Sequence, residues 1–307
     1  MPSIDTISMK KVDLVLGYGP HNGSMQGLAS LVHYLKRESQ DLHVAWWLLE
    51  NLPNGRFADV TADLGAAFRL WGDRAFNGRL PGSDLRFLQQ GQRWRILGEI
   101  KQLCRRGVID SLISGSSPRA EFLQRRGIDS LVVPFGFSPE MGQDLALPRD
   151  VDVAFLGNRN ASRRRRRILS QVSSELKKTN REIVFPRGYL GGNQRTEFLN
   201  RCKIVLNVLK SPRDSVGHRF LLCAGNGAMI VSEPNLDNEA FVSGRDFVTS
   251  QIGQIAETVE FYLQMDSLRH KIAETASHFV HQELTLKNML SRILQHVKPA
   301  PTGTKSL

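Results

Sequence analysis

The sequence predicts an α/β protein with two doubly wound parallel sheets, and three observations carry this prediction. The chain has 307 residues, enough for about two domains. In both halves, short apolar runs typical of buried strands alternate with stretches of helical period, as in βαβ units. Residues 138–150 have a proline near each end and little period, and they separate the two series.

The first series starts at an apolar, glycine-bounded run that predicts a buried strand. A glycine-rich loop at 17–23 follows, and then apolar residues at helical spacing. Residues 51–92 show no strong period, so no element is predicted there. The strands expected are 12–16, 42–49, 109–113 and 130–133, and the helices are 25–38, 94–104 and 118–126.

The second series repeats the pattern and then ends in three helical stretches. The strands expected are 151–156, 182–185, 204–208 and 228–232, and the helices are 162–178, 194–202, 217–224, 252–264, 268–280 and 284–297. We therefore expect an N-terminal α/β domain over residues 1–140, a C-terminal α/β domain over 141–298, and a disordered tail over 299–307.

Composition narrows the class of protein. An apolar fraction of 41% and a charged fraction of 23% are ordinary for a globular protein and argue against a disordered chain. No run of about 18 apolar residues predicts a transmembrane helix, and the first residues lack the order of a signal peptide. The cysteines are Cys104, Cys202 and Cys223, whose spacing fits neither a disulfide framework nor a zinc site. We expect a cytoplasmic protein, with peripheral attachment to the inner face of the membrane as an open alternative.

The charge is strongly basic, with 41 Lys and Arg against 30 Asp and Glu, a formal net charge of +11. This balance favours anionic partners. Its densest part is an unbroken run at the start of an expected helix, namely Arg163, Arg164, Arg165, Arg166 and Arg167. Arginines at a helix N-terminus oppose the helix dipole, which suggests an anionic partner such as an acidic membrane surface. Aromatic residues are not interleaved with the run, so a nucleic-acid platform is not favoured.

A family resemblance rests on three segments of the second half: VDVAFLGN at 151–158, LNRCKIVLNVLKS at 199–211 and GHRFLLCAGNGAMIVSE at 217–233. Together with the Pro-Phe-Gly of 134–136, they resemble CgeB-like (spore-protein-like) glycosyltransferases of the GT-B superfamily. The resemblance covers about residues 105–295. It implies two Rossmann-like domains facing each other across a cleft, with the acceptor on the N-terminal side and a nucleotide-sugar donor on the C-terminal side.

The resemblance also implies roles for single residues. Arg219, Gly227, Ala228, Ser232 and Glu233 stand at places of the family pattern. The family usually has a glutamate three residues after the arginine, where it contacts the ribose hydroxyls, and this chain has Leu222 there. A leucine side chain accepts no hydrogen bond.

Sugar transfer from a nucleotide donor needs groups that stabilise the leaving diphosphate. Cations gather between an expected strand end and a helix start, namely Lys210, Arg213, His218 and Arg219. Gly157 and Asn158 follow a strand, where backbone N–H groups can approach a phosphate. Arg187 follows another strand, where the family often places the nucleotide base. Glu233 is expected on the sugar or ribose, and His21 as an acceptor base.

The function predicted is therefore metal-independent transfer of a sugar to an unidentified glycan, lipid or protein. Leu222 keeps open a non-catalytic scaffold of the same fold, and the arginine run keeps open a binder of anionic surfaces or nucleic acid. A dinucleotide site at Gly17 and Gly19 is disfavoured because Pro20 interrupts the motif and Glu50 is too distant. His278 and His281 have a metal-ligand spacing without an evident third ligand.

Overall fold

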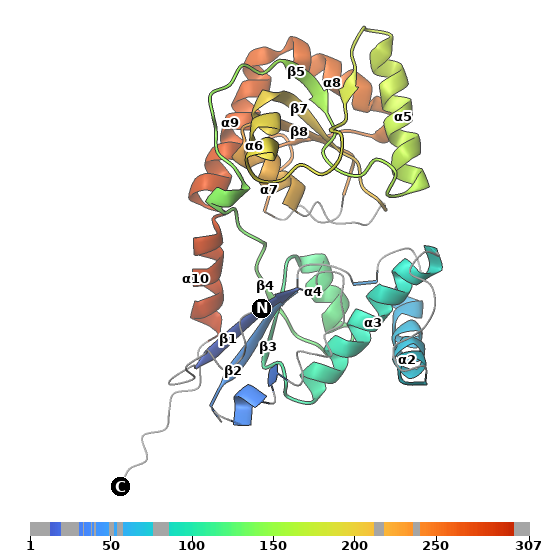
Figure 1. Ribbon diagram of the computed structural model, residues 1–307, viewed down its shortest axis with the longest axis vertical. Coiled ribbons are helices and arrows are strands. Elements are labelled where there is room, and N and C mark those ends of the chain that lie inside the picture. The colour runs from blue at the N-terminus through green and yellow to red at the C-terminus, as the bar shows by residue number, and fades with distance from the viewer. Residues whose placement is uncertain are drawn as a thin grey trace. The chain divides into compact units, whose positions relative to one another are not determined.

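The computed structural model describes residues 13–19, 31–32, 34–37, 39, 41–48, 52–53, 58–75, 86–211, 218–235 and 240–297. The contacts divide the chain into two compact units. Unit 1 takes the residues up to Val133 together with those from Arg292 on, and unit 2 comprises Pro134–Ser291. Figure 1 shows a sheet with covering helices in each unit. The domain boundary expected at residues 140 and 141 stays a prediction.

Unit 1 is built on a parallel sheet with strand order β1-β2-β3-β4. Its strands are β1 (Leu14–Gly19), β2 (His43–Leu48), β3 (Ser111–Ser114) and β4 (Leu131–Val132). These match the four strands expected from the apolar runs. The register pairs Gly17 with Trp46, whose ring leaves no space for a side chain on that glycine. The Trp46 indole donates to the Gly19 carbonyl at 3.3 Å.

The helices of unit 1 include one that the sequence pattern missed. Of the expected helix 25–38, residues 31–32 and 34–37 are described and are helical. The expected helices 94–104 and 118–126 are present as α3 (Arg86–Arg105) and α4 (Ser117–Gln124). The unpredicted helix is α2 (Ala58–Ala75), which packs on α3. Its buried positions are small residues, Ala62 and Ala66, and most of its large apolar residues are exposed, so no inward apolar stripe marked it.

Unit 2 contains a second parallel sheet, with strand order β6-β5-β7-β8-β9. The strands are β5 (Val151–Ala154), β6 (Ile183–Val184), β7 (Cys202–Asn207), β8 (Met229–Ser232) and β9 (Val248–Thr249). The short β9 was not predicted. The helices are α5 (Arg163–Lys177), α6 (Gly192–Arg201), α7 (His218–Gly225), α8 (Ile255–Gln264) and α9 (Asp266–Gln282), with short 3-10 turns η2 (Pro139–Met141) and η3 (Ile252–Gln254). Helix α10 (Leu286–His296) begins in unit 2 and ends in unit 1.

The core of unit 2 follows from the alternation of the strand residues. Phe155, Leu206 and Val231 extend one face of the sheet and are buried with side chains of α5, α8 and α9. The intervening residues Ala154, Val205 and Ile230 are also fully buried, so helices cover both faces, as a parallel sheet requires. None of the described helices is long and apolar enough to cross a membrane.

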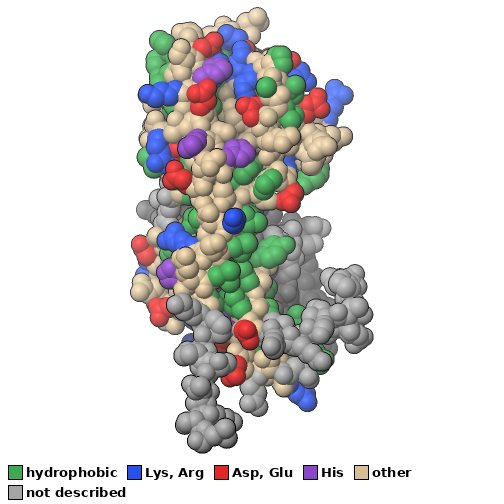
Figure 2. Space-filling view, turned by 90° about the vertical axis from the view of Figure 1, so that its left-hand side faces the viewer, with side chains coloured by type: hydrophobic (Ala, Val, Ile, Leu, Met, Phe, Trp, Pro, Cys, Tyr) green, Lys and Arg blue, Asp and Glu red, His purple; other side chains and the backbone are tan. Residues whose placement is uncertain are grey.

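Charged side chains of both signs are mixed on the face shown in Figure 2, where blue and red atoms alternate over the described residues. The excess of 11 positive charges is thus not gathered into one basic patch on that part of the surface. Salt bridges neutralise some of the cations locally, for example Arg201 with Asp150 at 2.6 Å.

The segment that was expected to link the series, residues 138–150, has η2 as its only regular turn and is fixed by side-chain hydrogen bonds. The buried amide of Asn200 donates to the Gln143 carbonyl at 2.8 Å and accepts from the Leu145 N–H at 2.7 Å. Arg149 reaches three carbonyls near the ends of α6 and α7, those of Leu199 (3.2 Å), Cys202 (2.8 Å) and Asn226 (3.0 Å). The last carbonyls of a helix have no backbone N–H partner within the helix, and the Arg149 guanidinium supplies donors to such carbonyls here.

We expect Arg149→Met to lower the free energy of unfolding by about 3 kcal/mol, because three carbonyls would lose their donor. Urea denaturation followed by circular dichroism measures the loss. The matched control is Arg201→Met, which removes an exposed ion pair and should cost much less, because solvent screens such a pair. Equal losses in the two variants would contradict the role given to Arg149.

Candidate functional site

A pocket of about 790 Å³ opens in unit 2 beyond the carboxyl ends of β5 and β6. This is where open α/β sheets bind ligands, and the volume lies within the range of small-molecule sites. The pocket is lined by Leu156, Gly157, Asn158, Arg159, Phe185, Pro186, Arg187, Gly188, Tyr189, Leu190, Arg195, Arg219 and Leu222.

The lining is strongly one-sided in charge. Among the described residues of the lining, the charged ones are all arginines, namely Arg159, Arg187, Arg195 and Arg219, and none is Asp or Glu. Guanidinium groups bind phosphate and carboxylate groups through two parallel hydrogen bonds. An aromatic wall lies beside them, because Phe185 lines the pocket and the Arg159 guanidinium lies 5.2 Å from its ring centre. The pocket therefore suits a ligand with both anionic and planar parts.

Arg219 is held at the base of the pocket by its own hydrogen bonds. Its Nε donates to the Leu156 carbonyl at 3.0 Å, and its Nη1 donates to the Asn207 side chain. The guanidinium also lies over the Phe155 ring, 5.1 Å from the ring centre. The side chain is thus fixed before any ligand binds, as a site for a polyanion requires.

Gly157 allows the Arg219 guanidinium to lie close to the backbone that follows β5. Its φ of +136° is a conformation that L side chains rarely adopt, and a Cβ there would stand 3.1 Å from Arg219 Nη2. The glycine therefore keeps backbone and guanidinium close together at the strand end.

The arginine run begins helix α5, and its members point in different directions, as predicted from helix geometry. Arg163, Arg166 and Arg167 are exposed. Arg165 is 9% exposed and donates to the Asn158 carbonyl at 3.1 Å. The expectation that all five arginines meet an acidic membrane surface is therefore wrong for Arg164 and Arg165, which bind their own protein.

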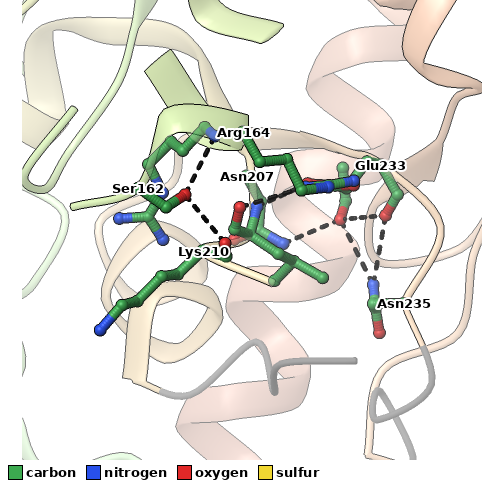
Figure 3. Close-up of polar contacts among 9 residues, drawn as sticks. Ser162, Arg164, Asn207, Lys210, Glu233 and Asn235 are labelled. Atoms are coloured by element: carbon green, nitrogen blue, oxygen red, sulfur yellow. Dashed lines mark hydrogen bonds and ion pairs between the residues drawn. The ribbon is translucent and has the colours of Figure 1, made fainter. Parts of the chain in front are cut away.

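Arg164 binds Glu233, as Figure 3 shows. The Glu233 carboxylate is 1% exposed, accepts two hydrogen bonds from the Arg164 guanidinium and accepts the Leu209 N–H at 2.6 Å. The contact joins the start of α5 to segments that follow β7 and β8. Glu233 is outside the pocket lining, so a sugar hydroxyl would have to compete with Arg164 for it. Its expected contact with sugar or ribose stays a prediction.

A short chain of hydrogen bonds links this ion pair to Arg219. Asn207, fully buried at the end of β7, accepts from Arg219 and donates from Nδ2 to Ser232 Oγ at 2.9 Å. The Ser232 hydroxyl in turn donates to the Glu233 carbonyl at 2.8 Å. The strand ends of β7 and β8 therefore position the arginine of the pocket.

The structure brings together Gly157, Asn158, Arg187 and Arg219 among the predicted site residues. Lys210 and His218 are not in the pocket lining. The Lys210 side chain extends away from Glu233 in Figure 3, and its carbonyl accepts the Ser162 hydroxyl at 2.9 Å. The His218 ring packs edge-on against Phe135 at 4.7 Å. His21 and Arg213 lie outside the described residues.

The sequence did not single out Phe185 or Arg195 of the pocket. Arg195 lies in the first turns of α6, where a surface arginine gives no recognisable signal. Phe185 ends an apolar run and was counted as a strand residue. The pairing of Arg164 with Glu233 spans 69 residues and had no local pattern that could have announced it.

Thiols and imidazoles do not contribute to a metal site among the described residues, where no cluster of three His, Cys, Asp or Glu occurs. Burial raises the pKa of the Cys202 and Cys223 thiols to about 12, and that of Cys104 to about 11, so all three stay protonated at neutral pH. His281 Nε2 lies 3.1 Å from the Gly225 carbonyl, and its ring packs on Phe137, which is a structural role.

We expect Arg164→Ala to destabilise the protein by about 3 kcal/mol, because it leaves a buried carboxylate without its cation. Its neighbour gives the control: Arg163→Ala should change the free energy of unfolding by less than about 0.5 kcal/mol. Adding Glu233→Gln to Arg164→Ala should recover part of the loss. Urea denaturation of the variants tests this, and a similar effect of the two single alanines would refute it.

Residues 160–295 match the family described as glycosyl transferase-like. The match covers α5 to α10, including Arg187, Arg219 and Glu233. The CgeB-like subfamily is not distinguished by this match. Among curated proteins, none matches the chain.

Solved structures similar to this one cover nearly the whole chain at low sequence identity. A glycosyltransferase from Rickettsia africae ESF-5 has a TM-score of 0.54 and 12% identity, over 93% of this chain and 97% of that one. Anabaena Alr3699/HepE, solved with UDP and glucose, has a TM-score of 0.54 and 12% identity, over 94% and 99%. A sucrose-phosphate synthase from Thermosynechococcus elongatus has a TM-score of 0.52 and 11% identity, over 92% and 94%.

The two parallel sheets, of four and five strands, thus have the GT-B fold of glycosyltransferases, and residues 160–295 are similar to the glycosyl transferase-like family.

Proposed function

We propose that this protein is a glycosyltransferase that transfers a sugar from a nucleoside diphosphate sugar to an acceptor. The observation that carries the proposal is the pocket at the ends of β5 and β6, where the described lining residues include four arginines and no acidic residue. The pocket is lined largely by residues of the segment that matches the glycosyl transferase-like family. The similar Anabaena protein was solved with UDP and with UDP-glucose.

The chemistry that these residues offer fits such a donor. When the bond from the sugar to the diphosphate breaks, negative charge grows on the leaving phosphate oxygens. A fixed guanidinium such as that of Arg219 stabilises this charge without reorganisation, and Arg187 adds a second cation at the pocket. The N–H groups of the Gly157–Asn158 turn are further donors for a phosphate. The nucleobase would use the aromatic wall of Phe185 and Tyr189.

Metal independence is part of the proposal. Where arginines neutralise the leaving diphosphate, no divalent cation is needed for charge, and the lining residues that the structure describes offer no carboxylate to hold one. The acceptor, a glycan, a lipid or a protein, is left open. His21 and Arg213, outside the described residues, stay proposed as acceptor base and phosphate ligand.

We expect one nucleoside diphosphate, or its sugar, to raise the melting temperature by about 5 °C at ~100 times its Kd, since binding adds about 2.7 kcal/mol to the folded state. A thermal-shift panel of UDP, GDP, ADP, dTDP and CMP with their sugars, with and without EDTA, measures this. The shift should survive EDTA. Loss of the shift in EDTA would refute metal independence, and no shift with any nucleotide would refute the donor site.

Two arginine variants distinguish specific binding in the pocket from attraction by the general positive charge of the protein. Arg187→Ala removes an exposed cation from the pocket lining, and Arg166→Ala removes an exposed cation of α5 outside that lining. We expect Arg187→Ala to raise the nucleotide Kd about 10-fold or more, and Arg166→Ala to leave it within about twofold, because a charge-assisted hydrogen bond contributes roughly 1.5–3 kcal/mol. Isothermal titration calorimetry measures the nucleotide Kd of both variants. Equal increases in Kd would mean that the nucleotide is attracted by the general positive charge and not bound by the pocket.

A second candidate function is a binding protein without transfer. It is favoured by Leu222, which lines the pocket, and by the engagement of Glu233 with Arg164. Both remove carboxylates from a site where sugar and ribose hydroxyls would need acceptors. Release of the nucleoside diphosphate from the bound donor, followed over hours with and without candidate acceptors, distinguishes the two. Binding without any release would favour this candidate over transfer.

Contact with an acidic membrane surface is carried at most by the exposed Arg163, Arg166 and Arg167. Three residues at about 1 kcal/mol each give a weak and salt-sensitive attachment.

A further inference from the structure

Helix α2 has its hydrophobic side turned to the solvent. Val60 and Leu64 are each 74% exposed, Phe68 is 65% exposed and Trp71 is 63% exposed. The described residues of this helix that are exposed are Val60, Thr61, Leu64, Ala67, Phe68 and Trp71, and none of them is charged. Surface helices normally show the opposite pattern, with charged residues outward.

The described charged side chains of α2, Asp63 and Arg69, are less exposed than its large apolar ones Val60, Leu64, Phe68 and Trp71. Asp63 pairs with Lys101 at 2.6 Å and with Arg126 at 3.1 Å, and these hold the helix against its own unit. Arg69 is also half-buried. Helix α2 packs on α3, outside it in Figure 1, so its outer face is available to a partner.

The size of this apolar face is that of an interface. The four large side chains expose roughly 500 Å², at the upper end of the largest patches on monomeric proteins. Two such faces packed together would bury about 1,000 Å² in total, which is close to the lower limit of specific interfaces. Phe68 and Trp71 lie together, with their ring centres 6.3 Å apart, and make one end of the face aromatic.

The spacing of the face favours a second helix. Val60, Leu64, Ala67 and Trp71 follow one another at intervals of four, three and four residues, which is the seam of a coiled coil. This spacing is also the same in both directions along the helix. Two copies of the seam therefore match when they run antiparallel about a twofold axis.

The side-chain sizes agree with that pairing. In the antiparallel arrangement Val60 of one copy meets Trp71 of the other, and Leu64 meets Ala67, so that each larger side chain lies against a smaller one. The four seam residues are uncharged, so no like charges meet between them. A lipid surface fits less well, since the exposed side chains described on α2 include no Lys or Arg to flank the apolar face.

We propose that this protein forms a symmetric dimer in which the α2 helices of two copies pack antiparallel through Val60, Leu64, Ala67 and Trp71. The proposal is independent of the pocket and of the proposed transfer reaction, because it concerns unit 1 and its test uses no nucleotide.

The first experiment is sedimentation equilibrium of the full chain between about 1 and 100 µM, where an interface of this size associates. The chain should form dimers, and Leu64→Glu should raise the dimer Kd by about 100-fold, because it places a carboxylate in the centre of the seam. Leu294→Glu is the control, since Leu294 is also an exposed leucine on a helix, 53% exposed on α10. Circular dichroism checks that each variant is folded.

The second experiment tests the pairing itself. The double variant Val60→Cys/Trp71→Cys should form a disulfide-linked dimer on mild oxidation, and neither single variant should. The two positions are 11 residues apart, about 16 Å along one helix, so they cannot bridge within a chain. The unsubstituted chain, oxidised in the same way, is the control for a disulfide formed through Cys104.

The proposal would be overturned if the chain stayed monomeric throughout the concentration range, or if Leu64→Glu and Leu294→Glu weakened the dimer equally. It would also be overturned if the double-cysteine variant did not form the linked dimer. A further contrary outcome is a monomer that floats with phosphatidylcholine–phosphatidylglycerol vesicles and no longer does so in Leu64→Glu. The last would assign the face to a lipid surface instead. A dimer weakened only by Leu64→Glu and trapped only by the cysteine pair would support it.

Discussion

The buried ion pair between Arg164 and Glu233 is the interaction on which the carboxyl edge of the second sheet depends. A carboxylate that is 1% exposed has no water to solvate it, so it is stable only with a cation and hydrogen-bond donors of the protein. Arg164 supplies the cation from the start of α5, and the Leu209 N–H supplies a donor after β7. One contact thus fixes the positions of a helix start and two strand ends. A separate chain of hydrogen bonds, from Arg219 through Asn207 and Ser232, ends on the backbone carbonyl of the same Glu233.

The arginines of this protein have two physical roles that composition does not separate. Arg149, Arg164 and Arg165 donate to backbone carbonyls and act as connectors between elements. A planar group with five donors can satisfy several carbonyls at once, which a lysine cannot do with the same geometry. The arginines around the pocket instead surround a space that a ligand can fill. A net charge of +11 therefore overstates the number of cations that an anionic partner can meet.

The two units differ in what they present to partners. Unit 2 offers a concave, cationic pocket at strand ends, a position determined by the parallel sheet. Unit 1 offers the convex face of helix α2, on which the exposed side chains that are described carry no charge. A concave cationic surface suits a small anion, whereas a convex apolar one gains free energy only when another apolar surface excludes water from it. The physics of the two surfaces is separate, and so are the ligands they select.

Much of the fold was determined by the sequence alone, because apolar runs and helical periods are local. The strands at 43–48, 111–114, 151–154 and 202–207 and the helices from α5 to α10 lie where the periodicity predicts them. Gly157 was also predictable, since it follows a strand that the pattern places, and Arg219 was singled out by the cluster of cations at a helix start and by the family resemblance. Only the tertiary structure decided which arginines turn inward, because the partner of Arg164 is 69 residues away. The tertiary structure alone also revealed α2, most of whose large apolar residues are exposed. A sequence pattern shows which positions of a helix are apolar, but it does not show which side of the helix faces the core.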